Sequence, residues 1–358
     1  MKILEKYLFF SILKASFATL LTLAVIFLFF KFLEDLSDIG NANYTTRASL
    51  RYLALSTPFV INSLTILGLM IGVIFSIGGL NSNKELQIYQ VATISLKQLI
   101  NRILIIGFLL CIIFLGVSES IFPITQKIAE NYKSKLLGKN NTTLNSSFWF
   151  RQDNKFLYIK KSKQSIDFDS IHVFEINDDS SLSSFSKNNS VSFDGKFLEL
   201  SNTKETRFDY SNDYSLSEEE ITTDLTFSFD NNFINNSKES LKTLSLRELL
   251  ELVVHSIKNE ITATKYLIEL VTRLVRPFTL IAMILVAIPF ILNFDRSSSI
   301  GNRIFLGIVI GVLTHLLTKI STIISLKFQF INFFGPLIPT FILIIIGLIL
   351  IKTKVINN

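Results

Sequence analysis

Six long apolar stretches, separated by polar segments, constrain the fold of this chain more than any other feature of its sequence. They cover residues 8–33, 52–80, 99–122, 274–293, 304–325 and 333–351. A helix rises about 1.5 Å per residue and needs about 20 residues to cross the hydrocarbon core of a bilayer. With 49% hydrophobic and 18% charged residues, the chain is too apolar for an ordinary soluble domain. We predict a membrane protein with six transmembrane helices.

The first stretch shares one feature with a cleaved signal peptide, because Lys2 and Lys6 precede it. The apolar region of a signal peptide is typically about 7 to 15 residues long. The stretch at 8–33 far exceeds that length. We therefore expect it to be retained as a helix.

The charges of the short loops predict the orientation. One side carries Lys2, Lys6, Lys14, Lys84, Lys97, Arg102, Arg296, Arg303, Lys352 and Lys354, and the other carries Lys31, Arg47, Arg51 and Lys327. Because cytoplasmic loops are enriched in lysine and arginine, we expect both chain ends in the cytoplasm. Residues 123–273 then lie outside, which in a bacterium means that they are periplasmic and the spans cross the inner membrane.

The long segment between the third and fourth spans has the pattern of a β-domain. Alternating, β-branched and aromatic residues predict strands at 155–159, 171–176, 191–193, 196–200, 206–210 and 221–229. Asp194-Gly195 is a hairpin signal, and the Asn- and Ser-rich segments at 138–147, 180–190 and 231–240 are expected to be loops. The predicted fold class is a mixed membrane protein: six transmembrane helices, three before and three after an inserted periplasmic β-jellyroll or sandwich.

The return to the membrane is predicted to be helical. Ser245 and Glu248 form a capping-box pattern before an apolar-periodic run, and a second helix should lead from about Thr262 into the fourth span. The predicted domains are therefore 1–122, with a short cytoplasmic helix at about 81–96, then the β-domain at 123–245, and finally 246–358 with the connecting helices and the last three spans.

Motifs for catalysis and nucleotide binding are missing from the sequence. The pairs Gly138-Lys139 and Gly195-Lys196 lack the other residues of a phosphate-binding loop. His172, His255 and His315 lie far apart without carboxylates at metal-binding spacing, and Cys111 is the single cysteine. We predict no metal, no cofactor and no catalytic residue, and the net charge of +6 does not imply a nucleic-acid partner.

Several stretches resemble the LptF/LptG permease family, whose members are membrane subunits of the ABC transporter that exports lipopolysaccharide. They are Phe30-Lys31-Phe32-Leu33-Glu34-Asp35 with Gly40 and Tyr44, Asn83-Lys84-Glu85-Leu86, Arg273-Leu274-Val275-Arg276-Pro277 continuing to Ala287-Ile288-Pro289-Phe290, Trp149-Phe150-Arg151 with Phe156-Leu157-Tyr158-Ile159, and Pro336 with Pro339. The first stretch favours the LptG branch. The resemblance covers nearly the whole chain.

This resemblance implies a set of partners. They are an LptF-like permease subunit, a cytoplasmic LptB-like ATPase dimer that hydrolyses ATP, periplasmic LptC/LptA-like jellyroll proteins, and lipopolysaccharide held in a cavity between the two permeases. It also implies that the helix near 81–96 is the coupling helix, in which Glu85, Leu86 and Tyr89 meet the ATPase. The alternative for Glu85 is a solvated carboxylate at a helix start, which the helix dipole stabilises by about 0.3 to 1 kcal/mol.

Cations near the outer ends of the spans are candidates for the lipid head group. The resemblance assigns Lys31 to a phosphate of lipid A, whereas the alternative is a lysine that snorkels to the interface. Ser37 and Asp38 stand where the family pattern has basic residues. Arg273, Arg276 and Lys319 are further candidates, and for each the alternative is an interface anchor.

Other residues have less defined expectations. Glu119, which precedes Pro123, should face a cavity or a partner rather than lipid, and His315 should be a core histidine or pair with a neighbouring subunit. Phe156 and Tyr158 lie on one strand whose inner face, by the resemblance, contacts acyl chains, whereas an ordinary sandwich core has the same pattern.

Two other functions remain open alongside an LptG-type permease. One is the paralogous LptF-type subunit of the same transporter. The other is a membrane-anchored scaffold or sensor whose β-domain binds a ligand without transport, which requires neither an acidic coupling helix nor cations in a cavity. A membrane enzyme ranks third, because the sequence offers no converging polar cluster.

Overall fold

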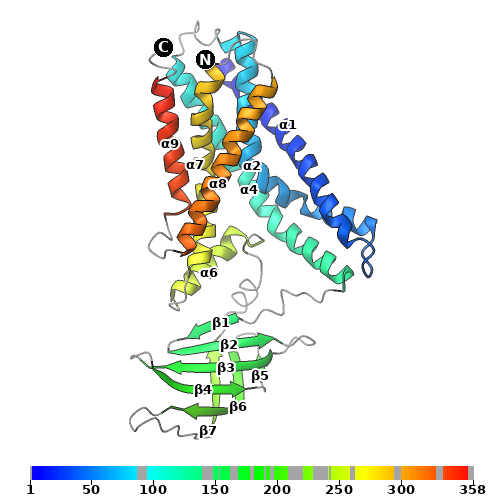
Figure 1. Cartoon of the computed structure of the whole chain (residues 1–358), viewed down its shortest axis with the longest axis vertical. Coiled ribbons are helices and arrows are strands. Elements are labelled where there is room, and N and C mark those ends of the chain that lie inside the picture. The colour runs from blue at the N-terminus through cyan, green and yellow to red at the C-terminus, as the bar shows by residue number, and fades with distance from the viewer. Residues whose placement is uncertain are drawn as a thin grey trace. The chain divides into compact units, whose positions relative to one another are not determined.

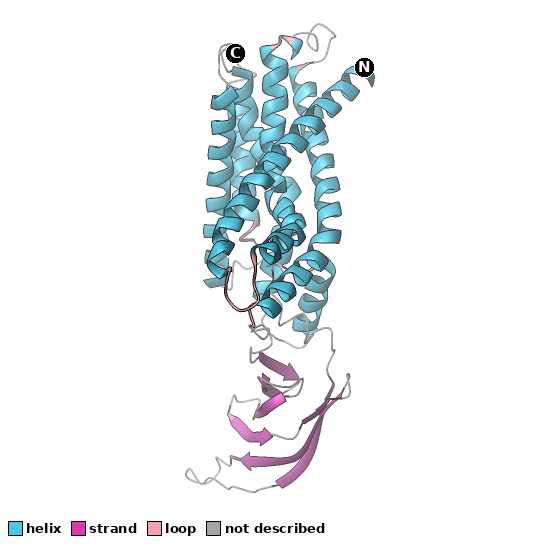
Figure 2. Ribbon diagram, turned by 90° about the vertical axis from the view of Figure 1, so that its right-hand side faces the viewer, coloured by secondary structure: helices cyan, strands magenta, loops and turns pink. Residues whose placement is uncertain are grey.

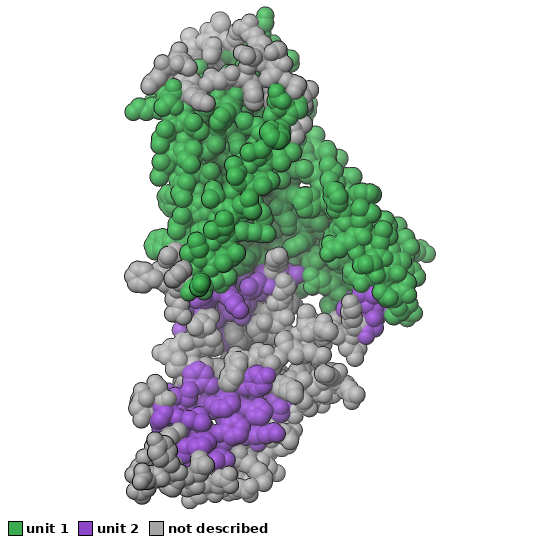
Figure 3. Space-filling model, in the orientation of Figure 1, with its two compact units in different colours: residues 1–133, 267–358 green, residues 134–266 purple. Residues whose placement is uncertain are grey.

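The structure is a computed structural model of the chain. It describes residues 2–86, 95–138, 148–152, 154–161, 168–177, 181–188, 191–193, 197–208, 221–228, 241, 243–258, 263–293, 300–327 and 334–353. Two compact units make up the chain, Met1–Lys133 together with Leu267–Asn358, and Ser134–Tyr266 (Figure 3). The first is built from helices and the second contains the strands, and each is described by itself.

Long apolar helices make up the first unit (Figure 1). They are α1 (Lys2–Asp35), followed by a short 3-10 turn η1 (Leu36–Asp38), α2 (Thr46–Ser82), α4 (Leu96–Leu136), α7 (Thr264–Asn293), α8 (Ile300–Lys327) and α9 (Leu337–Ile351). Among the described residues, five helices are long and apolar enough to cross a membrane. The prediction of a multi-pass membrane protein is therefore confirmed.

Two of the predicted spans have different lengths in the structure. The sixth predicted span is helical, but α9 has 15 residues, which corresponds to about 22 Å at about 1.5 Å per residue. It begins after Pro336, which occupies the N-cap position. The third span was expected to end near residue 122, whereas α4 continues through Pro123 to Leu136. Residues 123–136 are therefore helical rather than part of the β-domain.

Glycine pairs bring the backbones of neighbouring helices together. Gly68 and Gly72 of α2 face α1: a Cβ on Gly68 would lie 2.5 Å from Leu20 Cδ2, and one on Gly72 would overlap the backbone of Ser16. On α8, Gly311 likewise faces α2, where a Cβ would overlap the Leu67 side chain. Small residues four apart permit this close approach in membranes, where apolar burial gives no driving force between helices.

These contacts make α2 central and leave α1 peripheral. In the most apolar part of α2, 72% of the residues are buried, against 22% in α1, 28% in α4 and 28% in α8. The exposed faces of these peripheral helices carry large apolar side chains such as Phe17 and Phe27 of α1. Such faces suit contact with lipid. Helix α7 is also largely buried, at 61%, and Gly107 of α4 and Gly347 of α9 both lie against it.

The strands of the second unit form one antiparallel sheet, and Figure 2 shows the curvature of its longer strands. They are β1 (Phe148–Gln152), β2 (Lys155–Lys161), β3 (Phe168–Ile176), β4 (Leu182–Asn188), β5 (Val191–Phe193), β6 (Phe197–Arg207) and β7 (Ile221–Ser228). The order is β1-β2-β3-β4-β6-β5, with β7 also paired to β6. Helices before and after an inserted antiparallel sheet confirm the predicted fold class.

Two details of the strand prediction were wrong. Residues 180–190 were expected to be a loop, but β4 occupies Leu182–Asn188. Its serines are part of the paired strand: Ser184 and Ser186 are buried and pair with Glu175 and Val173 of β3. The strand expected at 206–210 is the end of the continuous strand β6. Pairing with neighbouring strands overrode the loop-like composition, as strand propensity depends strongly on context. The Asp194-Gly195 hairpin lies outside the described residues.

The predicted capping box is confirmed at the start of α6 (Leu246–Lys258). The Ser245 amide donates to Glu248 Oε2 at 2.7 Å, and the Glu248 amide donates to Ser245 Oγ at 3.3 Å. These reciprocal bonds satisfy two amides that a helix start otherwise leaves without partners. The capping box therefore fixes where α6 begins.

Candidate functional site

A buried carboxylate organises the junction between α1 and α2. Asp35 ends α1 and is 3% exposed. Tyr44 Oη donates to its Oδ2 at 2.5 Å, Ser49 Oγ donates to the same oxygen, and Lys133 of α4 binds Oδ1. Burial and the hydrogen bond to Asp35 raise the pKa of Tyr44 above its ordinary value, so its hydroxyl remains a donor. The aspartate thereby ties α1, the connecting loop, α2 and α4 together.

Lys133 is neutralised inside this cluster. Its ammonium pairs with Asp35 and lies 2.7 Å from Asp38 Oδ2. The same ammonium lies 5.6 Å from the ring centre of Tyr44 and 5.1 Å from that of Tyr52. Asp38 thus serves as an internal counter-ion.

Lys31 has a different environment one helical turn before Asp35. Its ammonium lies 4.9 Å from the ring centre of Tyr52, a cation–π contact. Among the described residues, Lys133 makes the ion pairs with Asp35 and Asp38, and Lys31 interacts electrostatically with Glu130 of α4. The Lys31 side chain is half-buried. Lys31 therefore contacts the ring of Tyr52 next to Lys133, whose charge is neutralised by Asp35 and Asp38.

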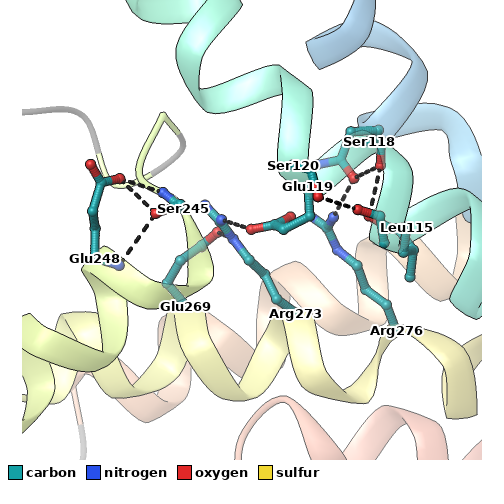
Figure 4. Close-up of polar contacts among 11 residues, drawn as sticks. Leu115, Ser118, Glu119, Ser120, Ser245, Glu248, Glu269, Arg273 and Arg276 are labelled. Carbon is teal, nitrogen blue, oxygen red and sulfur yellow. Dashed lines mark hydrogen bonds and ion pairs between the residues drawn. The ribbon is translucent and has the colours of Figure 1, made fainter.

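A second charged cluster joins α4 to α7 in the helical unit (Figure 4). Arg273 Nη1 lies 2.8 Å from Glu119 Oε1, and Arg273 Nε lies 2.9 Å from Glu269 Oε1. The guanidinium also lies 5.5 Å from the ring centre of Phe122. The arginine side chain is 3% exposed. Two carboxylates and an aromatic face thus surround this cation, and Glu119 faces a partner helix as its position predicted.

Arg276 lies one turn further along α7 with weaker polar contacts. Its Nη1 is 3.4 Å from Asn62 Oδ1 of α2, and the same oxygen accepts a 2.9 Å hydrogen bond from Ser118 Oγ (Figure 4). Arg276 is half-buried. Arg273 and Arg276 therefore have separate partners, two carboxylates for Arg273 and a neutral amide oxygen for Arg276.

The acidic residue predicted for coupling lies at the other end of α1. Tyr7 Oη donates to Glu85 Oε2 at 2.8 Å, and Asn83 Nδ2 donates to Glu85 Oε1 at 3.3 Å. Leu86 is 6% exposed and packs into the core of the helical unit. Helix α2 runs to Ser82, so residues 81 and 82 belong to it rather than to the predicted short helix. Tyr89 lies outside the described residues.

Lys319 and His315 lie on α8 with exposed side chains. They belong to neither of the two charged clusters. An exposed lysine on an apolar helix can extend its ammonium to the membrane interface. The structure therefore does not bring Lys319 together with Lys31 or the two arginines.

The candidate residues of the sheet lie on its aromatic face. Tyr158 pairs with His172 across β2 and β3, Phe156 pairs with Phe174, and Phe174 lies 5.0 Å from the Phe185 ring. These side chains are half-buried. The opposite face carries Leu157, Ile171 and Val173, at most 3% exposed, together with the buried Ser184 and Ser186. The inner face of β2 is therefore that of Leu157 and not that of Phe156 and Tyr158.

Sequence reasoning missed the internal partners of these cations. Glu269 and Arg273 are four residues apart, a spacing that places both on one helix face. Asp35 stood out as a motif residue, but its partner Lys133 is 98 positions away. A charged residue in the continuation of an apolar helix was the available signal for Lys133, because such residues usually require a partner.

The class of protein is a multi-pass membrane protein with an inserted β-domain. It is defined by apolar helices of spanning length, by charged pairs between these helices and by an inserted antiparallel sheet. The chain belongs to the family described as lipopolysaccharide export system permease LptF/LptG, which it matches over residues 6–353. It is 22% identical over 348 residues, 96% of each chain, to the lipopolysaccharide export system permease protein LptG of Haemophilus influenzae. It is also 22% identical over 361 residues, 98% of each chain, to the protein of that name from Escherichia coli K12. These matches confirm the predicted family.

Proposed function

We propose that this chain is the permease subunit of an ABC transporter that extracts lipopolysaccharide from the inner membrane and passes it to a periplasmic β-jellyroll bridge towards the outer membrane. One observation carries the proposal: the match to the export permease family extends over residues 6–353. The names of both relatives support an LptG-type subunit over an LptF-type one. The chain breaks no covalent bond, and a separate LptB-like ATPase dimer hydrolyses ATP.

The lipid is held between this chain and an LptF-like partner. Lys31 is the candidate for a phosphate, because its ammonium faces the Tyr52 ring at 4.9 Å while Asp35 and Asp38 pair with Lys133. Arg276 is a second candidate, since a neutral amide oxygen at 3.4 Å leaves its charge available. A phosphate can accept several hydrogen bonds from either cation.

Two other cations fit structural roles better. Arg273 would have to leave Glu119 and Glu269 before it could bind a phosphate, so we assign it to the contact between α4 and α7. Lys319 is exposed on an apolar helix, and we assign it to the membrane interface as an anchor.

Coupling to the ATPase rests on Glu85. Its carboxylate is at the surface end of a segment whose next residue, Leu86, is buried, so we assign the ionic contact with the ATPase to Glu85. The ends of the chain and Glu85 are then cytoplasmic, and the sheet with its half-buried aromatic face, including Phe156 and Tyr158, is periplasmic. There LptC/LptA-like jellyroll proteins receive the lipid.

Co-purification tests this function. The tagged chain is purified in mild detergent beside Glu85→Lys and, as a matched control, Glu5→Lys, which reverses a charge at the same end of the helical unit. We expect the unaltered chain and Glu5→Lys to retain an ATPase, an LptF-like chain and lipopolysaccharide, and Glu85→Lys to lose the ATPase. A chain that purifies alone would contradict the transporter and favour the scaffold.

A further inference from the structure

Tyr7 connects α1 to the residue assigned to the ATPase contact. Its hydroxyl donates to Glu85 Oε2 at 2.8 Å across a sequence separation of 78 residues. Asn83 Nδ2 donates to the other oxygen at 3.3 Å. The hydrogen bond from Tyr7 therefore joins the second turn of α1 to the segment that follows α2.

The backbone around Glu85 fixes this arrangement. Asn83 caps α2, its amide donating to Gly79 O at 3.0 Å. Lys84 then adopts a φ of 62°, a left-handed conformation that is uncommon for a residue other than glycine. Leu86 is held in the core at 6% exposure. Glu85 lies between a sharp turn and a buried anchor, so its backbone is held on both sides.

Helix α1 is continuous from Tyr7 to the cluster around Asp35. The helix runs from Lys2 to Asp35, and Tyr7 and Asp35 are separated by about 42 Å along its axis at about 1.5 Å per residue. Lys31 and Asp35 lie at its far end. An α-helix without a proline or a break transmits displacement along its axis, since kinks have such local causes.

We propose that Tyr7 is a positioning residue that links Glu85 to α1, so that ATPase movement reaches Lys31 and Asp35 through this helix. The inference rests on the proposed function and adds the path by which movement of the ATPase reaches the lipid-binding end of α1. A carboxylate has about four acceptor sites. Glu85 therefore can bind Tyr7 and a basic residue of the ATPase at the same time, and the two contacts need not compete.

The test uses the complete transporter in lipid bilayers containing lipopolysaccharide, with Tyr7→Phe in this chain. Bound ATPase, ATP hydrolysis and lipopolysaccharide released per ATP are measured. Loss of one hydrogen bond worth about 0.5 to 1.5 kcal/mol should lower the lipid released per ATP about threefold, while the amount of bound ATPase stays unchanged. In a Glu85→Ala background, which has no acceptor for the Tyr7 hydroxyl, Tyr7→Phe should add much less, because the two side chains act as one unit.

Glu5→Gln is the matched control. It weakens the neighbouring contact of α1 with α4, in which Arg102 Nη1 lies 3.1 Å from Glu5 Oε1, and leaves Glu85 untouched. The yield per ATP should stay as in the unaltered chain. An unchanged yield in Tyr7→Phe, an equal loss in Glu5→Gln, or a full additional loss in the Glu85→Ala background would overturn the inference. An unaltered transporter that releases no lipopolysaccharide would instead overturn the proposed function, and the inference with it.

Discussion

Lys31 and Arg273 are both cations in long apolar helices, yet the structure gives them opposite surroundings. Arg273 lies between two carboxylates of α4 and α7, with 3% of its side chain exposed. Lys31 faces the ring of Tyr52, Asp35 and Asp38 pair with Lys133, and Glu130 of α4 interacts electrostatically with Lys31. The comparison shows that a cation in an apolar helix can have either of two different surroundings. Arg273, which also lies beside the Phe122 ring, is paired with two carboxylates and connects α4 to α7. Lys31 makes neither of the ion pairs of Lys133, and it is the cation that we propose for a ligand.

The largest expected effect comes from breaking the neutralised site. Arg273→Ala leaves Glu119 and Glu269 without their shared cation in the helical unit. Removing one partner of a buried ion pair typically costs about 3 to 5 kcal/mol, and we expect a loss of that size in the free energy of unfolding, measured by SDS titration in mixed micelles. Leu274→Ala, at an exposed neighbour on α7, is the control. A loss below about 1 kcal/mol would place the ion pairs in contact with solvent.

Asp35→Ala should have the next largest effect. It removes the acceptor of Tyr44 and Ser49, and a buried donor without a partner costs about 1 to 3 kcal/mol. The loss should be smaller than for Arg273→Ala because Lys133 keeps its contact with Asp38. The same titration measures it, with Glu34→Ala at the exposed neighbouring position as control. Equal stability of the two variants would show that Asp35 does not organise the junction.

Lys31→Gln should separate stability from ligand binding. A cation–π contact is worth about 0.5 to 1 kcal/mol at exposed sites, so unfolding should change little. Retention of lipopolysaccharide by the purified complex should fall about tenfold, because a charge-assisted hydrogen bond contributes about 1.5 to 3 kcal/mol. Lys14→Gln, at an exposed lysine in the amino-terminal half of α1, serves as the control. Retention equal to that of the control would remove Lys31 from the lipid site.

The smallest effect is expected for Lys319→Gln. An exposed substitution away from a cluster usually changes stability by less than about 0.5 kcal/mol, and an interface anchor leaves lipid retention unchanged. Both are measured as for Lys31→Gln. If Lys319→Gln lost as much lipopolysaccharide as Lys31→Gln, Lys319 would also contact the lipid. An exposed lysine and a lysine beside an aromatic ring would then not differ in function.

Local patterns carried most of the fold prediction. The apolar stretches located every long helix, and the Ser245 to Glu248 capping box located the start of α6. The ends of the helices were harder to predict: α4 continues past Pro123 because buried residues such as Gln126 and Ala129 extend its packed face. Strand β4 was missed because its serines resemble a loop until they are paired with β3.

The sequence by itself determined that this chain spans a membrane several times, carries an inserted β-domain and resembles the LptF/LptG family. These features could be predicted because the length of an apolar stretch, the alternation of a strand and a short motif are local properties of the sequence. Tertiary structure alone decided which cations are neutralised, which helices are central and which face of β2 is buried. Those outcomes depend on partners far away in the chain. Lys133 reaches Asp35 across 98 residues and Arg273 reaches Glu119 across 154, separations at which no local pattern specifies a contact.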